Sequence, residues 1–124
     1  MYIAHIGIKM QISKDLIAAS ATPLLLSILE KGDDYGYSII KKVKELSSNR
    51  IEWTEGMLYP VLHRLENQKA IKSYWKESEK GRKRKYYKIN KAGNELLEDQ
   101  KKQWQAVNDA LQNTWNVDFK FSFS

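Results

Sequence analysis

The fold of this chain is decided by one stretch, Glu55-Gly56-Met57-Leu58-Tyr59-Pro60-Val61-Leu62-His63-Arg64-Leu65-Glu66. Its aliphatic residues recur at helical spacing, which predicts an amphipathic helix with one buried face formed by Leu58, Val61, Leu62 and Leu65. Tyr59, Pro60 and His63 point the other way, so the exposed face of this helix is unusual. Thr54 precedes the stretch and can cap the helix. We therefore expect a helix that presents aromatic and polar side chains to a partner.

A strongly basic segment follows the helix, Lys80-Gly81-Arg82-Lys83-Arg84-Lys85-Tyr86-Tyr87-Lys88-Ile89. Six of the nine residues from Lys80 to Lys88 are Lys or Arg, and Gly81 can supply a turn. The flanking segments Ile71 to Glu77 and Arg84 to Ile89 are rich in Tyr, Trp and Ile, which favours strands. The sequence thus predicts a hairpin with a cationic tip.

A short helix with an exposed face, followed by a cationic hairpin, is the arrangement that a winged helix-turn-helix uses on duplex DNA. The helix enters the major groove and the hairpin, or wing, holds flanking phosphates. We predict a DNA-binding regulator, mainly α with a small β-hairpin (α+β), with this domain over residues 13–90. The residues expected at DNA are Tyr37, Thr54, Glu55, Gly56, Tyr59, Pro60, His63, Arg64, Lys80, Arg82, Lys83, Arg84 and Lys85.

The roles expected within this set differ. Arg82, Lys83, Arg84 and Lys85 are expected to bind phosphates, and one of them can reach the minor groove. The helix has no Asn or Gln at its N-terminal end to read base edges. Its specificity is therefore expected to depend partly on DNA shape and on apolar contact with thymine methyl groups.

Length and composition fit this interpretation. A chain of 124 residues and 14.5 kDa is one domain with room for a dimerisation element. Its hydrophobic content of 42% suffices for a core, and a net charge of +6 with a pI of about 9.4 favours a polyanionic partner. The charge is informative because it gathers at the hairpin.

Other classes of function lack a sequence signature. The chain has no cysteine, and its only histidines, His5 and His63, have no ligand partners at metal-binding spacing. No nucleophile elbow, metal motif or Gly-rich phosphate loop is present, so we expect no enzyme and no cofactor. No run approaches the roughly 18 apolar residues of a membrane span, and Tyr2 to Ile8 is too short for a signal peptide, so we expect a cytoplasmic protein.

Two further helices are expected before the decisive stretch. Ser13 can cap the first, whose apolar face contains Leu16, Ile17, Leu24, Leu25, Ile28 and Leu29. Pro23 is expected either to start a helix at Thr22 or to kink a longer one. A second helix is expected from about Tyr37 to Ser47, with a buried stripe of Ile39, Ile40, Val43 and Leu46. Gly36 lies just before it, where close packing or a turn would suit.

A last helix is expected over residues 91–115, capped by Asn90. Leu97, Trp104 and Leu111 recur every seven residues, with Gln100 and Val107 between them, which is typical of a coiled-coil seam. A lone helix with such a seam needs a partner, and another copy of the chain is the simplest one. Residues 1–12 are expected to be an N-terminal extension, with Met10 as an alternative start. Residues 116–124, with alternating Phe119, Phe121 and Phe123, are expected to be a frayed tail.

The tryptophans and the paired tyrosines divide between core and surface. Trp53 and Trp75 sit beside expected strands and are expected in the core. Tyr86 and Tyr87 alternate faces, so at least one of them is expected in the core.

The chain resembles the PadR family of bacterial transcriptional regulators. The matching segments are Tyr35-Gly36-Tyr37-Ser38-Ile39, Gly56 to Glu66, Gly81-Arg82-Lys83-Arg84-Lys85-Tyr86-Tyr87, and Asn90-Lys91-Ala92-Gly93. The family usually has Thr where this chain has Asn90, and both residues cap helices. The resemblance implies a winged helix that binds a double-stranded DNA operator as a homodimer, and that acts as a repressor.

The single long helix after the hairpin is similar to the small subfamily, which includes a multidrug-sensing repressor. There a tryptophan of the final helix stacks planar drugs across the dimer interface, and Trp104, eleven residues after Gly93, occupies the matching place. The resemblance implies a planar aromatic or cationic effector bound by Leu16, Ala19, Trp104 and Asn108. Asn108 stands where that repressor has a carboxylate. An effector-independent winged helix or a protein-interaction module remains the alternative.

Overall fold

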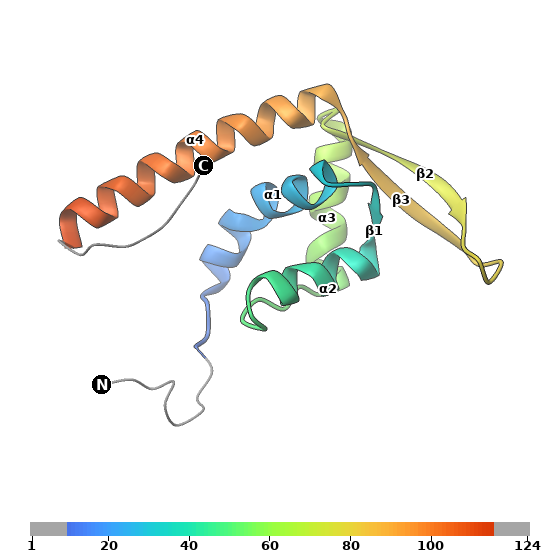
Figure 1. Cartoon of the computed structure of the whole chain (residues 1–124), viewed down its shortest axis with the longest axis horizontal. Coiled ribbons are helices and arrows are strands. Elements are labelled where there is room, and N and C mark those ends of the chain that lie inside the picture. Colours follow the sequence, from blue (N-terminus) through green and yellow to red (C-terminus); the bar gives the residue numbers. More distant parts are fainter. Residues whose placement is uncertain (1–9, 116–124) are drawn as a thin grey trace.

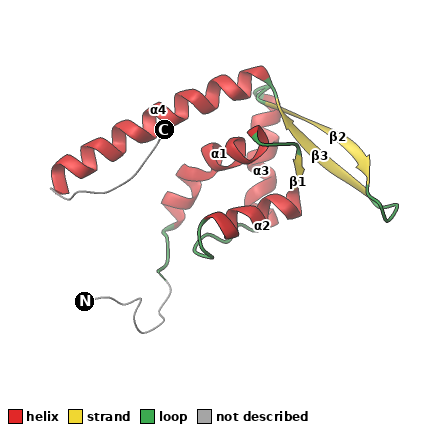
Figure 2. Cartoon of the chain, viewed as in Figure 1, coloured by secondary structure: helices red, strands yellow, loops and turns green. Residues whose placement is uncertain are grey.

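A computed structural model describes residues 10–115 of the chain (Figure 1). In this range the elements are α1 (Lys14–Glu30), β1 (Asp34–Tyr35), α2 (Gly36–Leu46), α3 (Glu55–Asn67), β2 (Ile71–Glu77), β3 (Lys83–Ile89) and α4 (Lys91–Trp115). The predicted class, mainly α with a small β-hairpin, is confirmed (Figure 2). Most of the expected extension and the whole expected tail lie outside the described residues. No helix of the described range has the length and apolar character that a membrane crossing needs.

Helix α1 begins where the sequence predicts. The Ser13 hydroxyl accepts a hydrogen bond from the Leu16 backbone N–H at 3.3 Å and so caps the helix. Of the two arrangements expected around Pro23, the structure has the longer helix, because α1 is continuous from Lys14 to Glu30. A proline inside a helix costs about 3 kcal/mol. Leu25 and Leu26 are completely buried just after it and each contribute about 1.5–3 kcal/mol, which offsets that cost.

Helix α2 packs by a narrower stripe than its sequence predicts. Ile39 and Val43 are completely buried, as expected. Leu46 was expected in the same stripe but is 67% exposed. It is the last residue of α2 and lines a surface groove with Lys31 and Glu45, at the edge of the core, which explains the difference.

Close packing at Gly36 joins α2 to α3. A Cβ atom at Gly36 would lie 2.7 Å from the hydroxyl oxygen of Tyr59, so any larger residue would have to displace that ring. This confirms the close packing expected there. The first turn of α2 and the first turns of α3 are therefore held side by side.

The sheet has three antiparallel strands in the order β1-β3-β2. The predicted hairpin is confirmed, with a register that runs from Ile71 opposite Ile89 to Glu77 opposite Lys83. Strand β1 was not predicted, because two residues are too few to show an alternating pattern. It pairs with Tyr86 and Tyr87 of β3 and places the start of α2 beside the hairpin.

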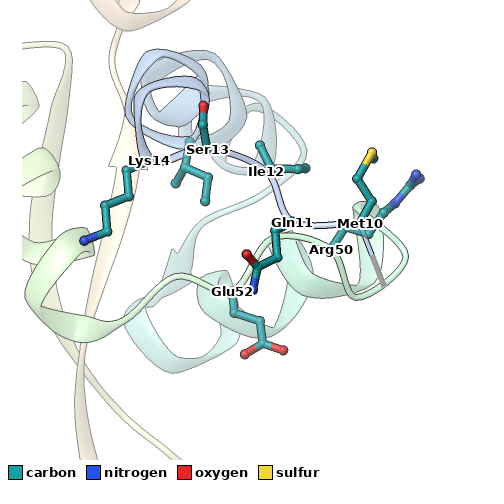
Figure 3. A pocket seen from close by; sticks show the side chains of 8 residues that line it. Met10, Gln11, Ile12, Ser13, Lys14, Arg50 and Glu52 are labelled. Atoms are coloured by element: carbon teal, nitrogen blue, oxygen red, sulfur yellow. The ribbon is translucent and has the colours of Figure 1, made fainter. Parts of the chain in front are cut away.

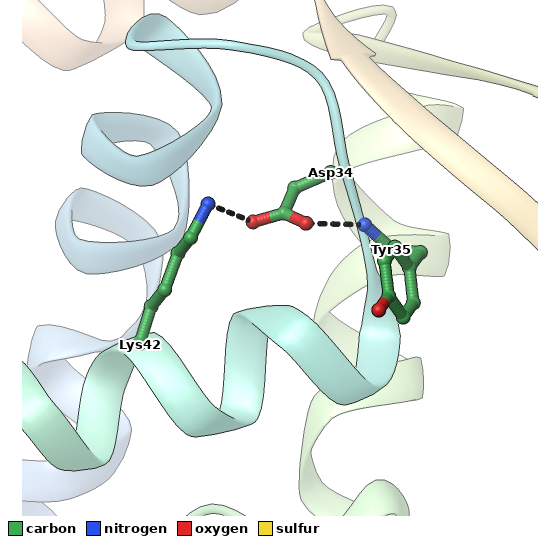
Figure 4. Close-up of polar contacts among 3 residues, drawn as sticks. All are labelled: Asp34, Tyr35 and Lys42. Carbon is green, nitrogen blue, oxygen red and sulfur yellow. Dashed lines mark hydrogen bonds and ion pairs between the residues drawn. The ribbon is translucent and has the colours of Figure 1, made fainter.

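An ion pair between a buried carboxylate and a half-exposed lysine fixes this third strand. The carboxylate of Asp34 accepts hydrogen bonds from Lys42 Nζ at 2.7 Å and from the Tyr35 backbone N–H at 2.9 Å (Figure 4). A buried carboxylate is tolerated only when its charge is paired in this way. Because Lys42 belongs to α2, the pair ties β1 to that helix.

The core lies where α1, α2, α3, the start of α4 and the near half of the hairpin meet. Tyr87 is buried there, which confirms that one of the two adjacent tyrosines belongs to the core, and Trp53 is buried as expected. Trp75 was expected in the core but is 66% exposed. The hairpin projects beyond the helices (Figure 1), so the residues of its far half have no helix to pack against.

Helix α4 joins the core through its first two turns. A Cβ atom at Gly93 would clash with the Ala70 carbonyl, so the helix starts in direct contact with the α3–β2 loop. Leu97 is completely buried inside the chain's own core, so it is not available to a partner as the predicted seam required. Beyond Leu97 the helix extends away from the body (Figure 2), and Val107 and Leu111 are exposed.

Candidate nucleic-acid interface

The exposed face of α3 carries the aromatic and polar residues that the sequence placed there. Thr54 caps the helix, its hydroxyl accepting a hydrogen bond from the Met57 backbone N–H at 3.2 Å. Pro60 and His63 are exposed, and the opposite face buries its leucines completely. The apolar face of the helix therefore packs against the core, and its polar and aromatic face is exposed.

Tyr59 is held more firmly than an exposed residue usually is. It is 37% exposed, and its hydroxyl lies over Gly36 at the start of α2. It also lies close enough to Tyr87 to affect that residue's pKa. Burial, followed by the charges of Tyr59 and Glu66, raises the pKa of Tyr87 from 10.0 to about 12. Tyr59 thus joins the exposed face of α3 to the start of α2.

The tip of the wing is built by a short turn. Gly81 has a φ of +76°, which confirms its predicted place in the turn. The Ser78 backbone N–H donates to the Arg82 carbonyl at 2.7 Å, and the Arg82 N–H donates to the Ser78 hydroxyl at 3.1 Å. The side chains of Lys80, Arg82 and Lys83 are exposed around this turn.

A cleft of about 530 Å³ joins α3 to the wing. Four elements line it: the end of β1, the start of α2, the start of α3 and the far half of the hairpin. Its lining residues are Tyr35, Gly36, Tyr37, Glu55, Tyr59, Trp75, Arg82, Arg84 and Lys85. Six of the thirteen predicted DNA-contacting residues thus come together in one place. The cleft contains three cationic side chains and one acidic side chain.

A ladder of three tyrosines, of which Tyr35 also lines the cleft, supports the wing on its other face. The ring centroid of Tyr86 lies 5.2 Å from that of Tyr35 and 5.9 Å from that of Tyr74. Cations lie over two of the rings: the Arg84 guanidinium is 4.5 Å from the centroid of Tyr35, at one end, and Lys76 Nζ is 5.2 Å from the centroid of Tyr86, in the middle. Such contacts contribute about 0.5–1 kcal/mol each at exposed sites.

The ladder is anchored to the loop before β1. The Tyr74 hydroxyl donates a hydrogen bond to Asp33 Oδ2 at 2.6 Å, and this bond is the main reason that the pKa of Tyr74 is raised. The wing is therefore connected to the body through β1 as well as through its own strands.

Several predicted residues lie outside this cleft. The Arg64 guanidinium donates to the Thr22 hydroxyl at 2.9 Å, so it holds α3 against α1. The residues expected at an effector site are spread over α1 and α4: Leu16 and Ala19 are exposed, and Trp104 and Asn108 are half-buried. With this exposure, the four residues of one protomer do not enclose a ligand by themselves.

Sequence reasoning missed three lining residues, Tyr35, Gly36 and Trp75, as members of this site. The face that Trp75 occupies could be derived from alternation along the strand. Trp75 lies two residues beyond Ser73, which pairs with Tyr87 across the hairpin. That alternation puts Trp75 on the core face. The sequence did not reveal where along the hairpin the covering helices end.

Another pocket, of about 590 Å³, lies between the start of α1 and the link before α3 (Figure 3). It is lined by Met10 to Lys14, Ile17, Arg50 and Glu52, and contains none of the predicted site residues. Within residues 10–115, no three His, Cys, Asp or Glu side chains gather in a way that could hold a metal ion. The cleft between α3 and the wing is therefore the candidate site.

The fold and this cleft together define a winged helix domain. A family model for PadR-like transcriptional regulators matches residues 25–99. The chain therefore belongs to the PadR-like family of transcriptional regulators.

Individual relatives agree with this membership. The uncharacterized protein X of Lysinibacillus sphaericus is 30% identical over 100 residues, which cover 81% of this chain and 92% of that protein. A transcriptional regulator from Clostridium thermocellum is 30% identical with a TM-score of 0.75, over 82% of this chain and 96% of the other. A PadR family transcription regulator from Clostridium difficile is 36% identical with a TM-score of 0.68, over 79% and 99% of the two chains.

Proposed function

We propose that this protein is a homodimeric transcriptional repressor that binds a near-palindromic DNA operator. Each protomer inserts α3 into a major groove and rests its wing on adjacent phosphates. One observation carries the DNA-binding part of this proposal: a single cleft joins Tyr59 of α3 to Arg82, Arg84 and Lys85 of the wing. Family membership supports the regulatory role.

The side chains divide by chemistry into groove and backbone contacts. Tyr37, Tyr59, Pro60 and His63 face the groove, and none of them offers the paired hydrogen bonds that distinguish one base pair from another. DNA shape and apolar contact with thymine methyl groups are therefore the proposed sources of specificity. Arg64 is assigned to positioning α3, because its guanidinium already donates to Thr22.

The proposed contact between the wing and DNA is tested through the salt dependence of DNA affinity. An operator selected from a randomised duplex library is compared with random DNA, using fluorescence anisotropy at several salt concentrations. Arg82→Ala plus Lys83→Ala should lower the affinity for the operator and the affinity for random DNA by similar factors. The slope of log affinity against log salt should flatten by about 0.9 for each phosphate that the variant no longer neutralises.

A matched control is Lys31→Ala plus Lys102→Ala, which removes the same charge from exposed positions just after α1 and on α4. This control should leave the slope almost unchanged. Equal slopes for the wing variant and wild type would mean that the wing does not contact DNA.

The proposed dimer uses the part of α4 beyond Leu97. Trp104, Val107 and Leu111 follow each other at helical spacing, the last two are exposed, and no other described element covers that end of the helix. A two-fold axis across this stripe would bury the same patch from both copies. It would also set the two α3 helices against the two halves of a palindromic site.

Sedimentation tests this interface. Val107→Asp plus Leu111→Asp should convert the dimer to a monomer. The control, Gln105→Asp plus Asn113→Asp, adds the same two charges on the opposite side of the helix and should remain dimeric. A dimer that survives the first pair of substitutions would rule out this stripe.

The proposed effector is a planar aromatic or cationic molecule held between the two Trp104 side chains, with Leu16, Ala19 and Asn108 around it. Effector binding would weaken DNA affinity by favouring one of two dimer states. Planar cations should then quench tryptophan fluorescence, and Trp104→Ala should abolish the quenching in a protein that still dimerises.

The second candidate is an effector-independent winged-helix regulator or protein-interaction module. Asn108 favours this alternative, because an amide attracts a cation less than the carboxylate of the multidrug-sensing repressor that this helix resembles. DNA affinity that no planar compound changes would support this candidate.

A further inference from the structure

Trp75, the tryptophan of the hairpin, is 66% exposed. An isolated apolar residue on a surface needs no explanation. This indole, however, lines the cleft between α3 and the wing, together with three cationic side chains. Neither the family membership nor the DNA contacts proposed above assign it a role.

The register of the hairpin shows which way Trp75 faces. Trp75 lies opposite Lys85, and the next pair on the same face is Ser73 with Tyr87. Alternate residues of a strand share a face, so Trp75 and Lys85 continue the face that Tyr87 presents to the core. At Tyr87 that face is covered by helices. At Trp75 the helices have ended, and the indole is 66% exposed.

The opposite wall of the cleft comes from α2 and α3. Tyr37, which is 72% exposed, and Tyr59 stand there with Glu55. The wing wall brings Arg82, Arg84 and Lys85. Three cations against a single carboxylate make the cleft complementary to an anion, while the indole and the two phenol rings offer apolar faces.

A sugar–phosphate strand has this combined chemistry. Its phosphates are anions at regular intervals, and between them each deoxyribose presents a small apolar face. A single free anion would use the cations and leave the indole without a function. The cleft also opens between the helix proposed for the major groove and the wing proposed for the flanking phosphates, where one DNA strand has to pass.

We propose that Trp75 packs against a deoxyribose of the DNA strand that crosses this cleft, while Lys85 and Arg82 bind phosphates on either side of that sugar. This inference rests on the proposed DNA binding and adds an apolar backbone contact to it. Contacts to sugar and phosphate position a protein on DNA but do not read its sequence. Trp75 therefore contributes affinity for any duplex rather than preference for the operator.

The apolar contact of Trp75 can be distinguished from the cationic contacts by the salt dependence of DNA binding. Trp75→Ala should weaken binding to operator and to random duplex alike by about tenfold, toward the lower end of what an aromatic contact contributes on nucleic acid. The salt slope should stay unchanged, because every cation that binds a phosphate is still present. Lys85→Ala should instead flatten the slope by about 0.9.

The matched control is Leu46→Ala. Leu46 is an equally exposed apolar residue at the far end of α2, so its truncation should leave DNA affinity unchanged. Trp75→Phe keeps an aromatic face and should retain affinity within about threefold of wild type. It should also lose the part of the DNA-induced change in tryptophan fluorescence that comes from this site. The Phe variant decides the question if the Ala variant folds poorly.

The outcomes separate the contact between Trp75 and a deoxyribose from DNA binding by the protein as a whole. If Lys85→Ala flattens the salt slope but Trp75→Ala changes affinity by less than about twofold, the wing binds DNA and the indole contact is wrong. If Trp75→Ala lowers operator affinity but not random affinity, the indole touches a base and not a sugar, and the assignment also fails. If wild-type protein binds no duplex, the proposed function itself fails.

Discussion

The two ends of the β2–β3 hairpin share their strands and a side-chain face, but they differ in what covers that face. At the near end, Ile71 and Tyr87 are buried under helices. At the far end, Trp75 and Lys85 lie on the same face of the same two strands, yet they border an open cationic cleft. The comparison teaches that alternation in a strand determines which face a residue occupies. Neighbouring elements determine whether that face is core or surface.

The largest expected effect on stability comes from a substitution at the buried end of the hairpin. Tyr87→Ala should destabilise the protein by about 3–5 kcal/mol, as expected for truncation of a buried aromatic ring. Trp75→Ala, on the next pair along the same face, should cost less than about 1 kcal/mol because the indole packs against little. Urea denaturation of both variants measures the difference. Similar losses at both positions would mean that the far end belongs to the core after all.

A second prediction concerns the helix that closes the near end. Gly93→Ala should destabilise by about 1–3 kcal/mol, because the added methyl group meets the Ala70 carbonyl and a methylene group of Ile89. The control is Gly56→Ala on α3, where a Cβ atom would meet only the Thr54 hydroxyl at 3.8 Å. There alanine should stabilise by about 0.5–1 kcal/mol. A neutral Gly93→Ala would show that α4 can shift away from the loop.

The last effect appears only in alkali. The pKa of Tyr87 is about 12 in the folded chain and 10.0 for an unperturbed tyrosine. Between those values the unfolded chain has lost the proton that the folded chain keeps, so stability falls as pH rises through that window. Tyr87→Phe has no such proton. The difference in unfolding free energy should be constant below about pH 10 and then shift in favour of the variant. A constant difference up to about pH 12 would show that burial does not raise this pKa.

Much of the fold follows from local sequence patterns. Thr54, Ser13 and Gly81 specify where helices and a turn begin, because capping and positive φ depend on one or two residues. The helix Glu55–Asn67 and the hairpin are long enough for their periodicity to be detected. These features do not need knowledge of the rest of the chain.

The misplaced residues share one physical cause. For Leu46, Trp75 and Leu97, the predicted face of the helix or strand is correct but the predicted burial is wrong. Burial depends on where a neighbouring helix ends. Strand β1 is two residues long and is held by Asp34, an interaction between segments that no local pattern encodes. In the candidate site, the sequence identified the cations and the helix, whereas the cleft between them required tertiary structure.

The tyrosine ladder has a consequence for the kind of duplex that such a protein would accept. Tyr35 is a rung of the ladder and also the residue before α2, and Tyr59 rests on Gly36 at the start of that helix. A tilt of the wing must therefore disturb both helices, so the span between the wing tip and α3 is a fixed length. In the proposed DNA complex, that span would set the groove width that the protein fits. Duplexes whose grooves do not match that width must bend to fit, and the cost of bending varies with base sequence at positions that no side chain touches.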